Sequence, residues 1–115
     1  MSRAATTSDV FNAIAEPRRR EIVGLLAGGQ PRSVGDLVDA MQLPQPAVSK
    51  HLAVLRKVGV VTVQKSGQAR LYTLNPSELK TVHEWVGQFE KLWESQLDRV
   101  KLRAEKIAKE RSVRN

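Results

Sequence analysis

The sequence predicts a mainly α-helical protein with one small β-hairpin, an α+β chain of four short helices, the hairpin and one long helix. Three observations predict this class. Apolar residues recur every three or four positions through most of the chain, one segment after residue 60 alternates with a period of two, and Gly or Pro residues separate the segments. A length of 115 residues corresponds to a single domain.

The first two helices are predicted from residue 6 to residue 15 and from Pro17 to the pair Gly28 and Gly29. Proline is well tolerated in the first turn of a helix, and two consecutive glycines end one. The first helix gathers its apolar residues on one side, and these are Val10, Phe11, Ile14 and Ala15.

The next two helices are separated only by the short segment QLPQP, residues 42–46. Ser33, with Asp36 three residues later, predicts a capping box at the start of the third helix. The fourth helix ends at Gly59, and at about 100° per residue it has one apolar face formed by Val48, Leu52 and Leu55. Its opposite face carries Pro46, Lys50, Ala53 and Lys57. A small and basic face suits approach to phosphates better than packing against another helix.

Residues 60–74 then predict the hairpin. Val61, Val63 and Lys65 alternate with polar residues, Ser66-Gly67-Gln68 form a turn, and a second strand follows with Leu71–Leu74. Asn75 as N-cap, Pro76 in the first turn and Glu78 predict a strong helix start after it.

A heptad-like stripe runs along this last helix, from residue 76 to about residue 110, with one stutter around Trp93. Its members are Leu79, Val82, Val86, Phe89, Trp93, Leu97, Val100, Ala104 and Ile107. A helix this long cannot pack its whole length on so small a domain, so we expect a symmetric homodimer. Its interface is expected to contain Val10, Phe11, Ile14, Val82, Trp85, Val86, Phe89, Leu92 and Trp93. The alternative is a helix folded back on its own core, with a charged tail from about Lys101.

The net charge of +7 is concentrated in the middle of the chain. From Pro17 to Leu74 there are nine Lys or Arg residues and three acidic residues, whereas the flanking segments are nearly balanced. A basic centre is typical of a nucleic-acid-binding domain. The absence of Cys excludes disulfides, thiolate metal sites and a Cys nucleophile. With no apolar leader and no membrane-length run, we expect a cytoplasmic protein without membrane association.

Two short helices joined by a tight turn and followed by a basic hairpin predict a winged helix-turn-helix, with the helix-turn-helix at about 33–58 and the wing at about 60–74. In such a module the start of the second helix meets base edges in the major groove. Gln suits adenine, a small Ala suits the thymine methyl group, and Ser or Lys suits bases or phosphates. The predicted DNA-binding residues are Gln45, Ala47, Ser49, Lys50, His51, Val54, Lys57, Lys65, Gln68, Arg70 and, for a phosphate, Arg19.

Five segments in order resemble the ArsR-type (ArsR/SmtB-like) winged-helix transcriptional regulators: AIAEPRRREIVGLL, SVGDLVDAM, QPAVSKHLAVLRKVGVV, KSGQARLYTLNP and the long final helix. The resemblance covers residues 8 to 100. It implies a homodimer, joined through the first helix at about 7–15 and the last at about 76–110, that binds an inverted repeat in double-stranded promoter DNA and represses transcription. His51 resembles the family's usual His, with a structural or phosphate-contacting role.

The resemblance excludes the family's thiolate metal site, because Ser33 and Gly35 stand where metal-sensing members carry Cys. A second family site, on the last helix, corresponds here to Thr81, His83, Glu94 and Leu97. Two ligands of four are too few for a tight divalent site, so we expect neither a metal nor a cofactor. The sequence does not indicate a small-molecule effector.

Three other classes of function are alternatives to this prediction. An enzyme is not supported, because no phosphate loop, nucleophile or carboxylate pair is recognisable. A protein-interaction module would need an apolar outer face on the fourth helix. A non-specific, nucleoid-like DNA binder differs from a sequence-specific regulator only in its specificity ratio.

Overall fold

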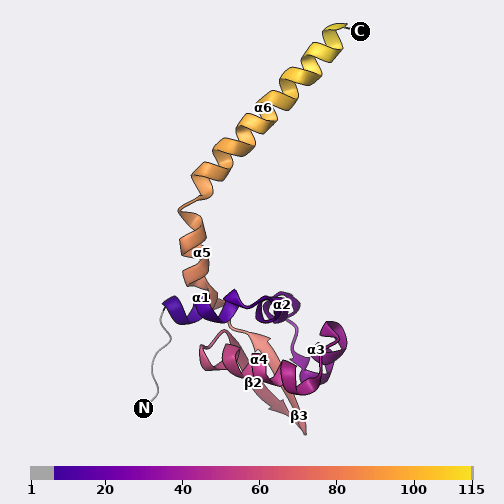
Figure 1. Cartoon of the computed structure of the whole chain (residues 1–115), viewed down its shortest axis with the longest axis vertical. Helices are drawn as coiled ribbons and strands as arrows, with labels where there is room; N and C mark the ends of the chain where they lie inside the picture. The colour runs from indigo at the N-terminus through magenta and orange to yellow at the C-terminus, as the bar shows by residue number, and fades with distance from the viewer. Residues whose placement is uncertain (1–6, 115) are drawn as a thin grey trace. The chain divides into compact units, whose positions relative to one another are not determined.

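The computed structural model describes residues 7–114 and divides the chain into two compact units, one ending at Val82 and one beginning at His83 (Figure 1). The first unit contains α1 (Thr7–Ala15), α2 (Pro17–Leu26), β1 (Arg32–Ser33), α3 (Val34–Met41), α4 (Gln45–Lys57), β2 (Val61–Ser66), β3 (Ala69–Leu74) and the 3-10 helix η1 (Pro76–Leu79). Helix α5 (Lys80–Gly87) spans the boundary and α6 (Glu90–Arg114) follows it. The predicted class, mainly helical with a small hairpin, is confirmed.

Helices α1 and α2 meet at a tight junction. Glu16 is the N-cap of α2, and its carboxylate accepts a hydrogen bond from the Arg19 backbone N–H at 3.0 Å. Pro17 occupies the first turn, as predicted, because its missing N–H would have no partner there. The first helix was expected to begin at Thr6, which lies outside the described residues.

Helices α3 and α4 form the helix-turn-helix. The predicted capping box is present, because the Ser33 hydroxyl accepts from the Asp36 N–H and the Asp36 carboxylate accepts from the Ser33 N–H. Helix α4 begins after Pro44, which offers no side-chain cap. It ends in a Schellman motif, where Gly59 takes a positive φ of 84° and the Val60 N–H donates to the Leu55 carbonyl at 3.0 Å.

The sheet has one more strand than the sequence predicted. Its order is β1-β3-β2, all antiparallel, and β1 sets Arg32 opposite Tyr72 and Ser33 opposite Leu71. A strand of two residues cannot show a period of two, so only the pairing with β3 reveals it. The hairpin turn is also shorter than predicted, because Ser66 pairs with Ala69 and leaves Gly67 and Gln68 as a two-residue loop.

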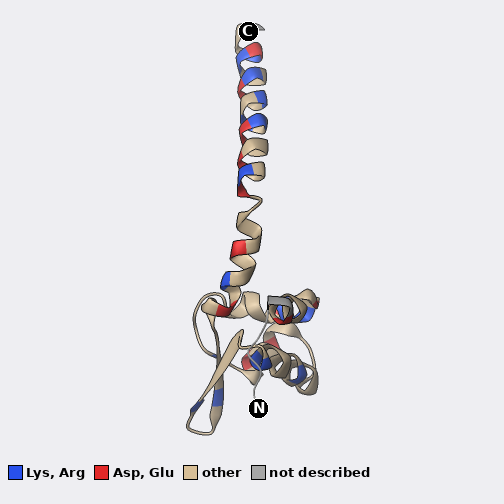
Figure 2. Ribbon diagram, turned by 90° about the vertical axis from the view of Figure 1, so that its left-hand side faces the viewer, with Lys and Arg blue, Asp and Glu red and all other residues tan. Residues whose placement is uncertain are grey.

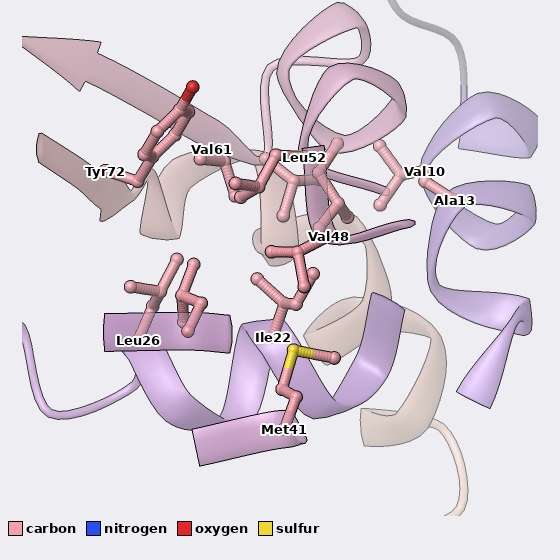
Figure 3. Close-up of a cluster of buried hydrophobic side chains, with 12 residues drawn as sticks. Val10, Ala13, Ile22, Leu26, Met41, Val48, Leu52, Val61 and Tyr72 are labelled. Carbon is pink, nitrogen blue, oxygen red and sulfur yellow. The ribbon is translucent and has the colours of Figure 1, made fainter. Parts of the chain in front are cut away.

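The core lies between the helices and one face of the sheet (Figure 3). It contains Val10, Ala13, Ile22, Leu26, Leu37, Met41, Val48, Leu52, Leu55, Val60, Val61 and Tyr72, all at most 8% exposed. The apolar face predicted for α4 is therefore confirmed. Val10, expected at the surface between two copies, is instead 2% exposed inside its own chain. Helix α1 turns it inward together with Ala13, three residues later on the same face.

The single long helix predicted from residue 76 is interrupted twice. It begins as the 3-10 turn η1, and Asn75 makes no side-chain cap, because its Oδ1 accepts from the Ser77 hydroxyl at 2.7 Å instead. A turn at Gln88 and Phe89 then separates α5 from α6. Gly87 disfavours a continuous helix, and the Gln88 side-chain amide takes up the Trp85 carbonyl at 3.0 Å.

Within residues 83–114, the second unit consists of the end of α5, the Gln88–Phe89 turn and α6. None of its residues from 83 to 113 is buried. It has no core of its own, so a single folded domain over residues 1–115 remains a prediction. No helix within residues 7–114 combines the length and the apolar character needed to cross a bilayer.

Candidate nucleic-acid interface

A basic groove lies between α4 and the β2–β3 hairpin. Its volume is about 640 Å³, and it is lined by Val34, Gln45, Ser49, Leu52, Ala53, Arg56, Lys57, Arg70 and Tyr72. A smaller hollow of about 190 Å³ continues it along the hairpin, between Arg56, Val63, Lys65 and Arg70. The lining includes four cations and no carboxylate. Such a groove attracts an anionic ligand.

Helix α4 positions one wall of this basic groove. Its core side is held by Val48, Leu52 and Leu55, so Gln45, Ser49 and Lys57 are exposed on other sides. Five residues of α4 line the groove: Gln45, Ser49, Ala53, Arg56 and Lys57. Four of them, at positions 45, 49, 53 and 57, follow one another at intervals of four, and Arg56 follows Ser49 by seven, so all five lie on one side of the helix. Lys50 is also exposed but lies outside the groove lining, and Ala47 is half-buried.

The hairpin positions the other wall. Lys65, Gln68 and Arg70 are all exposed, and Lys65 is the cross-strand neighbour of Arg70. Figure 2 shows Lys and Arg segments in blue on both strands of the hairpin. Like charges placed directly opposite each other in a sheet are destabilising. An anion bound between them would relieve that repulsion.

The two remaining α4 residues predicted to bind DNA have different surroundings. Val54 is 37% exposed. The His51 side chain is only 22% exposed, and its Nδ1 lies 3.8 Å from the Glu16 carboxylate that caps α2. His51 therefore lies close to the start of α2, and both of its predicted roles stay predictions.

Arg19 has a structural position that differs from its predicted contact with a phosphate. Its Nε donates to the Ala13 carbonyl, and its Nη2 donates to the Asn12 carbonyl at 3.2 Å. Both carbonyls belong to the last turn of α1, where a cation is favoured by the helix dipole and by unpaired acceptors. Its neighbour Arg18 pairs with Glu21 at 3.0 Å. The guanidinium of Arg19 thus joins α1 to α2.

Sequence reasoning overlooked Arg56 as a site residue. Arg56 lines both hollows, and Arg70 is the other residue that does so. The sequence does contain a signal for Arg56, because this residue follows Ser49 by seven positions and therefore shares its face of the helix. Its closeness to Arg70 could not be read from the sequence, since it depends on how the hairpin folds beside α4.

The positions of the family's metal sites do not hold a metal-binding set of side chains. The Ser33 hydroxyl is engaged in the capping box, and Gly35 has no side chain. His83 lies in α5 and Glu94 in α6, on either side of the Gln88–Phe89 turn. Across residues 7–114, no three His, Asp or Glu side chains come together as possible ligands.

The residues predicted for a dimer interface are distributed over both units. In the first unit Phe11 and Ile14 are half-buried, and Val82 packs against the core of its own chain. In the second, Val86 and Phe89 are half-buried, and Trp85 and Trp93 are 53% and 50% exposed. The rings of Trp85 and Phe89 meet edge to face, 5.2 Å between centroids.

Comparison with known proteins gives one consistent result. The sequence profile described as "Bacterial regulatory protein, arsR family" matches residues 16–63. The transcriptional repressor SdpR of Bacillus subtilis is 34% identical over 82 residues, which cover 71% of this chain and 90% of SdpR. The HTH-type transcriptional repressor SmtB of Mycobacterium tuberculosis is 47% identical over 66 residues, 57% of this chain and 48% of SmtB. The solved structure of an ArsR-like transcriptional regulator from Rhodococcus superposes with a TM-score of 0.62 at 26% identity and covers 83% of this chain and 89% of that one.

Proposed function

Because this chain belongs to the arsR family of bacterial regulatory proteins, which are DNA-binding transcription regulators and not enzymes, we propose that it is a homodimeric repressor that binds an inverted-repeat operator. The observation that carries the proposal is the basic groove between α4 and the hairpin. The names of SdpR and SmtB, both repressors, support the direction of regulation.

Helix α4 enters the major groove in this proposal, and the hairpin follows the neighbouring backbone or minor groove. Gln45 and Ser49 are exposed at the start of α4, where a recognition helix meets base edges. Gln45 pairs with adenine through its amide, and Lys50 reaches a base or a phosphate. Arg56, Lys57, Lys65 and Arg70 contact phosphates, which position the helix without reading sequence. The Lys65–Arg70 repulsion is then relieved by a phosphate.

A homodimer would present two such grooves related by two-fold symmetry. The proposed contact between copies involves Phe11, Ile14, Trp85, Val86, Phe89 and Trp93, of which the two Trp side chains are about half exposed. Aromatic anchors of this kind dominate many protein interfaces. Two symmetric grooves require two half-sites whose centres are about one helical turn apart, or a multiple of one turn.

The proposal contains no metal effector, because the residues at both family sites do not form a ligand set. It also favours DNA over a protein as the partner of α4. A protein-binding surface would need a contiguous apolar patch. The large apolar residue exposed on α4 is Val54, at 37%.

The test is fluorescence anisotropy on promoter DNA from upstream of the protein's own gene, against scrambled DNA of equal length, over a salt series and with or without zinc. We expect the native fragment to bind at least ~1000-fold more tightly at physiological salt, with no effect of zinc. Equal affinities that both collapse with salt would instead identify a non-specific DNA binder. Release by zinc would contradict the metal-independent proposal. Transcription in vitro from the same fragment decides between repression and activation.

Point variants test the placement of the groove. Gln45→Ala and Lys50→Ala are expected to cost roughly 1 to 3 kcal/mol against the operator and to leave the fold intact. Arg56→Ala and Arg70→Ala are expected to reduce the slope of log affinity against log salt by about one unit each. Arg18→Ala is the matched control, since its partner is Glu21. An unchanged operator affinity in Gln45→Ala and Lys50→Ala would refute α4 as the recognition helix.

A further inference from the structure

The last helix, α6, has a strongly basic second half. Residues 90–98 contain three acidic residues and one Lys, a net charge of −2, whereas residues 99–114 contain seven Lys or Arg residues and two acidic residues, a net charge of +5. Figure 2 shows Lys and Arg segments in blue on successive turns of this half. These cations are not part of the basic groove, whose lining comes from α3, α4 and the hairpin.

Four of these cations lie on one face of α6, which we call the basic face. Its members are Arg99, Arg103, Lys106 and Lys109. At about 100° per residue they fall within an arc of about 120°, and all four are exposed. Within residues 99–113, Glu110 is the single carboxylate that falls in the same arc. The face therefore keeps a clear positive charge.

The basic face is separate from the apolar stripe of the same helix. Within α6 the stripe follows positions 93, 97, 100, 104 and 107, and the centres of the two faces are about 140° apart around the helix. A partner that covers the apolar stripe therefore leaves the basic face accessible to another ligand.

Within residues 90–113 the structure gives the basic face no carboxylate partner. Arg99 donates to the Ser95 hydroxyl at 3.3 Å, and no ion pair in this range involves the four cations. Neighbours on the face are three or four residues apart, where like charges destabilise a helix. The helix dipole favours cations only in the last turn, whereas Lys106 precedes the end of α6 at Arg114 by eight residues. An anionic ligand would relieve this repulsion.

We propose that the basic face of α6 is a second DNA-binding surface, which contacts the phosphate backbone of duplex DNA without reading its sequence. Lys and Arg contacts to phosphates position a protein but carry no sequence information. At 1.5 Å per residue the face extends about 15 Å from Arg99 to Lys109. Duplex DNA carries one phosphate charge per ~1.7 Å of its axis, so the four cations can meet several phosphates at once.

DNA suits the basic face better than an anionic membrane does. A helix that lies on a membrane inserts its apolar side and keeps its cations near the headgroups. In α6 this placement would also bring Glu90, Glu94 and Asp98 to the anionic surface. Duplex DNA is already a ligand of this family of regulators. A duplex bound elsewhere on the same chain presents its phosphates to α6 at a high effective concentration.

This inference goes beyond the proposed function, which uses only α4 and the hairpin to bind DNA. It makes the affinity depend on α6 as well, but it leaves the choice of sequence to α4. A substitution in the basic face is therefore expected to weaken binding to promoter DNA and to scrambled DNA by the same factor.

Paired substitutions with Gln test the basic face, because Gln removes the charge and is a good helix former. Arg103→Gln with Lys106→Gln removes two charges from the face. Lys101→Gln with Arg111→Gln is the matched control, since it removes two charges from other sides of α6. The full-length proteins are titrated with scrambled duplex DNA of fixed length over a salt series, with fluorescence anisotropy as the readout.

The Arg103/Lys106 variant is expected to bind scrambled DNA at least ~5-fold more weakly and to reduce the slope of log affinity against log salt by about two units, one for each lost contact. The control variant should keep the wild-type slope. Arg99→Gln with Lys109→Gln repeats the test at the two ends of the face and should also reduce the slope. Equal slopes in the control and in both basic-face variants would refute the proposal.

Exchange of the two central cations tests whether charge is the cause. Arg103→Lys with Lys106→Arg keeps both charges on the face and is expected to bind scrambled DNA as the wild-type protein does. A loss of affinity as large as that of the Gln variant would overturn the phosphate contact, because a change of side-chain shape alone would then weaken binding.

Vesicles of phosphatidylserine and phosphatidylcholine test the competing ligand. If the wild-type protein binds them, the Arg103/Lys106 variant does not, and the DNA salt slope is unchanged, the basic face is a lipid-binding surface and the proposal is wrong. Promoter DNA separates the inference from the proposed function. Equal wild-type affinities for promoter and scrambled DNA refute the proposed function, whereas the slopes on scrambled DNA still decide whether α6 binds DNA.

Discussion

Replacing Arg19 with Ala is expected to destabilise the fold while leaving DNA binding almost unchanged. The Arg19 guanidinium donates to the carbonyls of Ala13 and Asn12 at the end of α1. Each hydrogen bond from a charged group contributes roughly 1.5 to 3 kcal/mol when buried and less at the surface. Since this guanidinium is only partly buried, we expect a loss of about 1 to 3 kcal/mol in the free energy of unfolding.

The assay for Arg19→Ala combines thermal unfolding, followed by far-UV circular dichroism, with anisotropy on operator DNA over a salt series. For a unit of this size the loss corresponds to a fall in Tm of roughly 5 to 20 °C. The neighbouring Arg20 is the matched control, because it is exposed and no side-chain bond from it is seen in the part of the chain described. An unchanged Tm together with a salt slope reduced by about one would refute the structural role and restore the predicted phosphate contact.

Two further stability predictions concern local backbone signals. Ser33→Ala removes half of the capping box of α3 and should lower the free energy of unfolding by about 1 kcal/mol, measured by urea denaturation; Ser33→Asp, which can still cap, should recover most of the loss. Gly67→Ala should lower the free energy of unfolding by about 1 to 2 kcal/mol, because Gly67 has a φ of 64° in the hairpin turn. An added Cβ would meet no other atom there, so backbone strain alone would cause the loss. Gly28→Ala, which has no such φ, is the control. Equal effects of the two glycine substitutions would contradict that cause.

Most of the first unit could be predicted from local patterns. The face formed by Val48, Leu52 and Leu55, the capping box of Ser33 and the start of α2 at Pro17 all depend on residues within one or two turns of each other. Such features can be predicted from the sequence because the residues that form them are close to one another along the chain. The basic character of α4 and the hairpin was equally visible, and so was the family.

The sequence-based predictions were wrong where the local structure depends on a residue distant along the chain, or on two local preferences that compete. Strand β1 exists because β3 offers Leu71 and Tyr72 as its neighbours. Val10 is one of several apolar residues in its helix, and only packing against the core selects which of them turn inward. The break after Gly87 depends on a balance between a heptad pattern that continues through it and a glycine that favours a turn.

By itself, the sequence determined that this protein is a basic winged helix-turn-helix, because period, caps and turn residues act locally. Only the tertiary structure decided which cations form the groove. The Arg19 guanidinium binds carbonyls at the end of α1 and joins α1 to α2. Arg56 and Arg70, fourteen residues apart in the sequence, instead line the same hollow. The charge of an arginine is a property of the residue, but the atoms that it reaches depend on how helices and strands distant along the chain pack against each other.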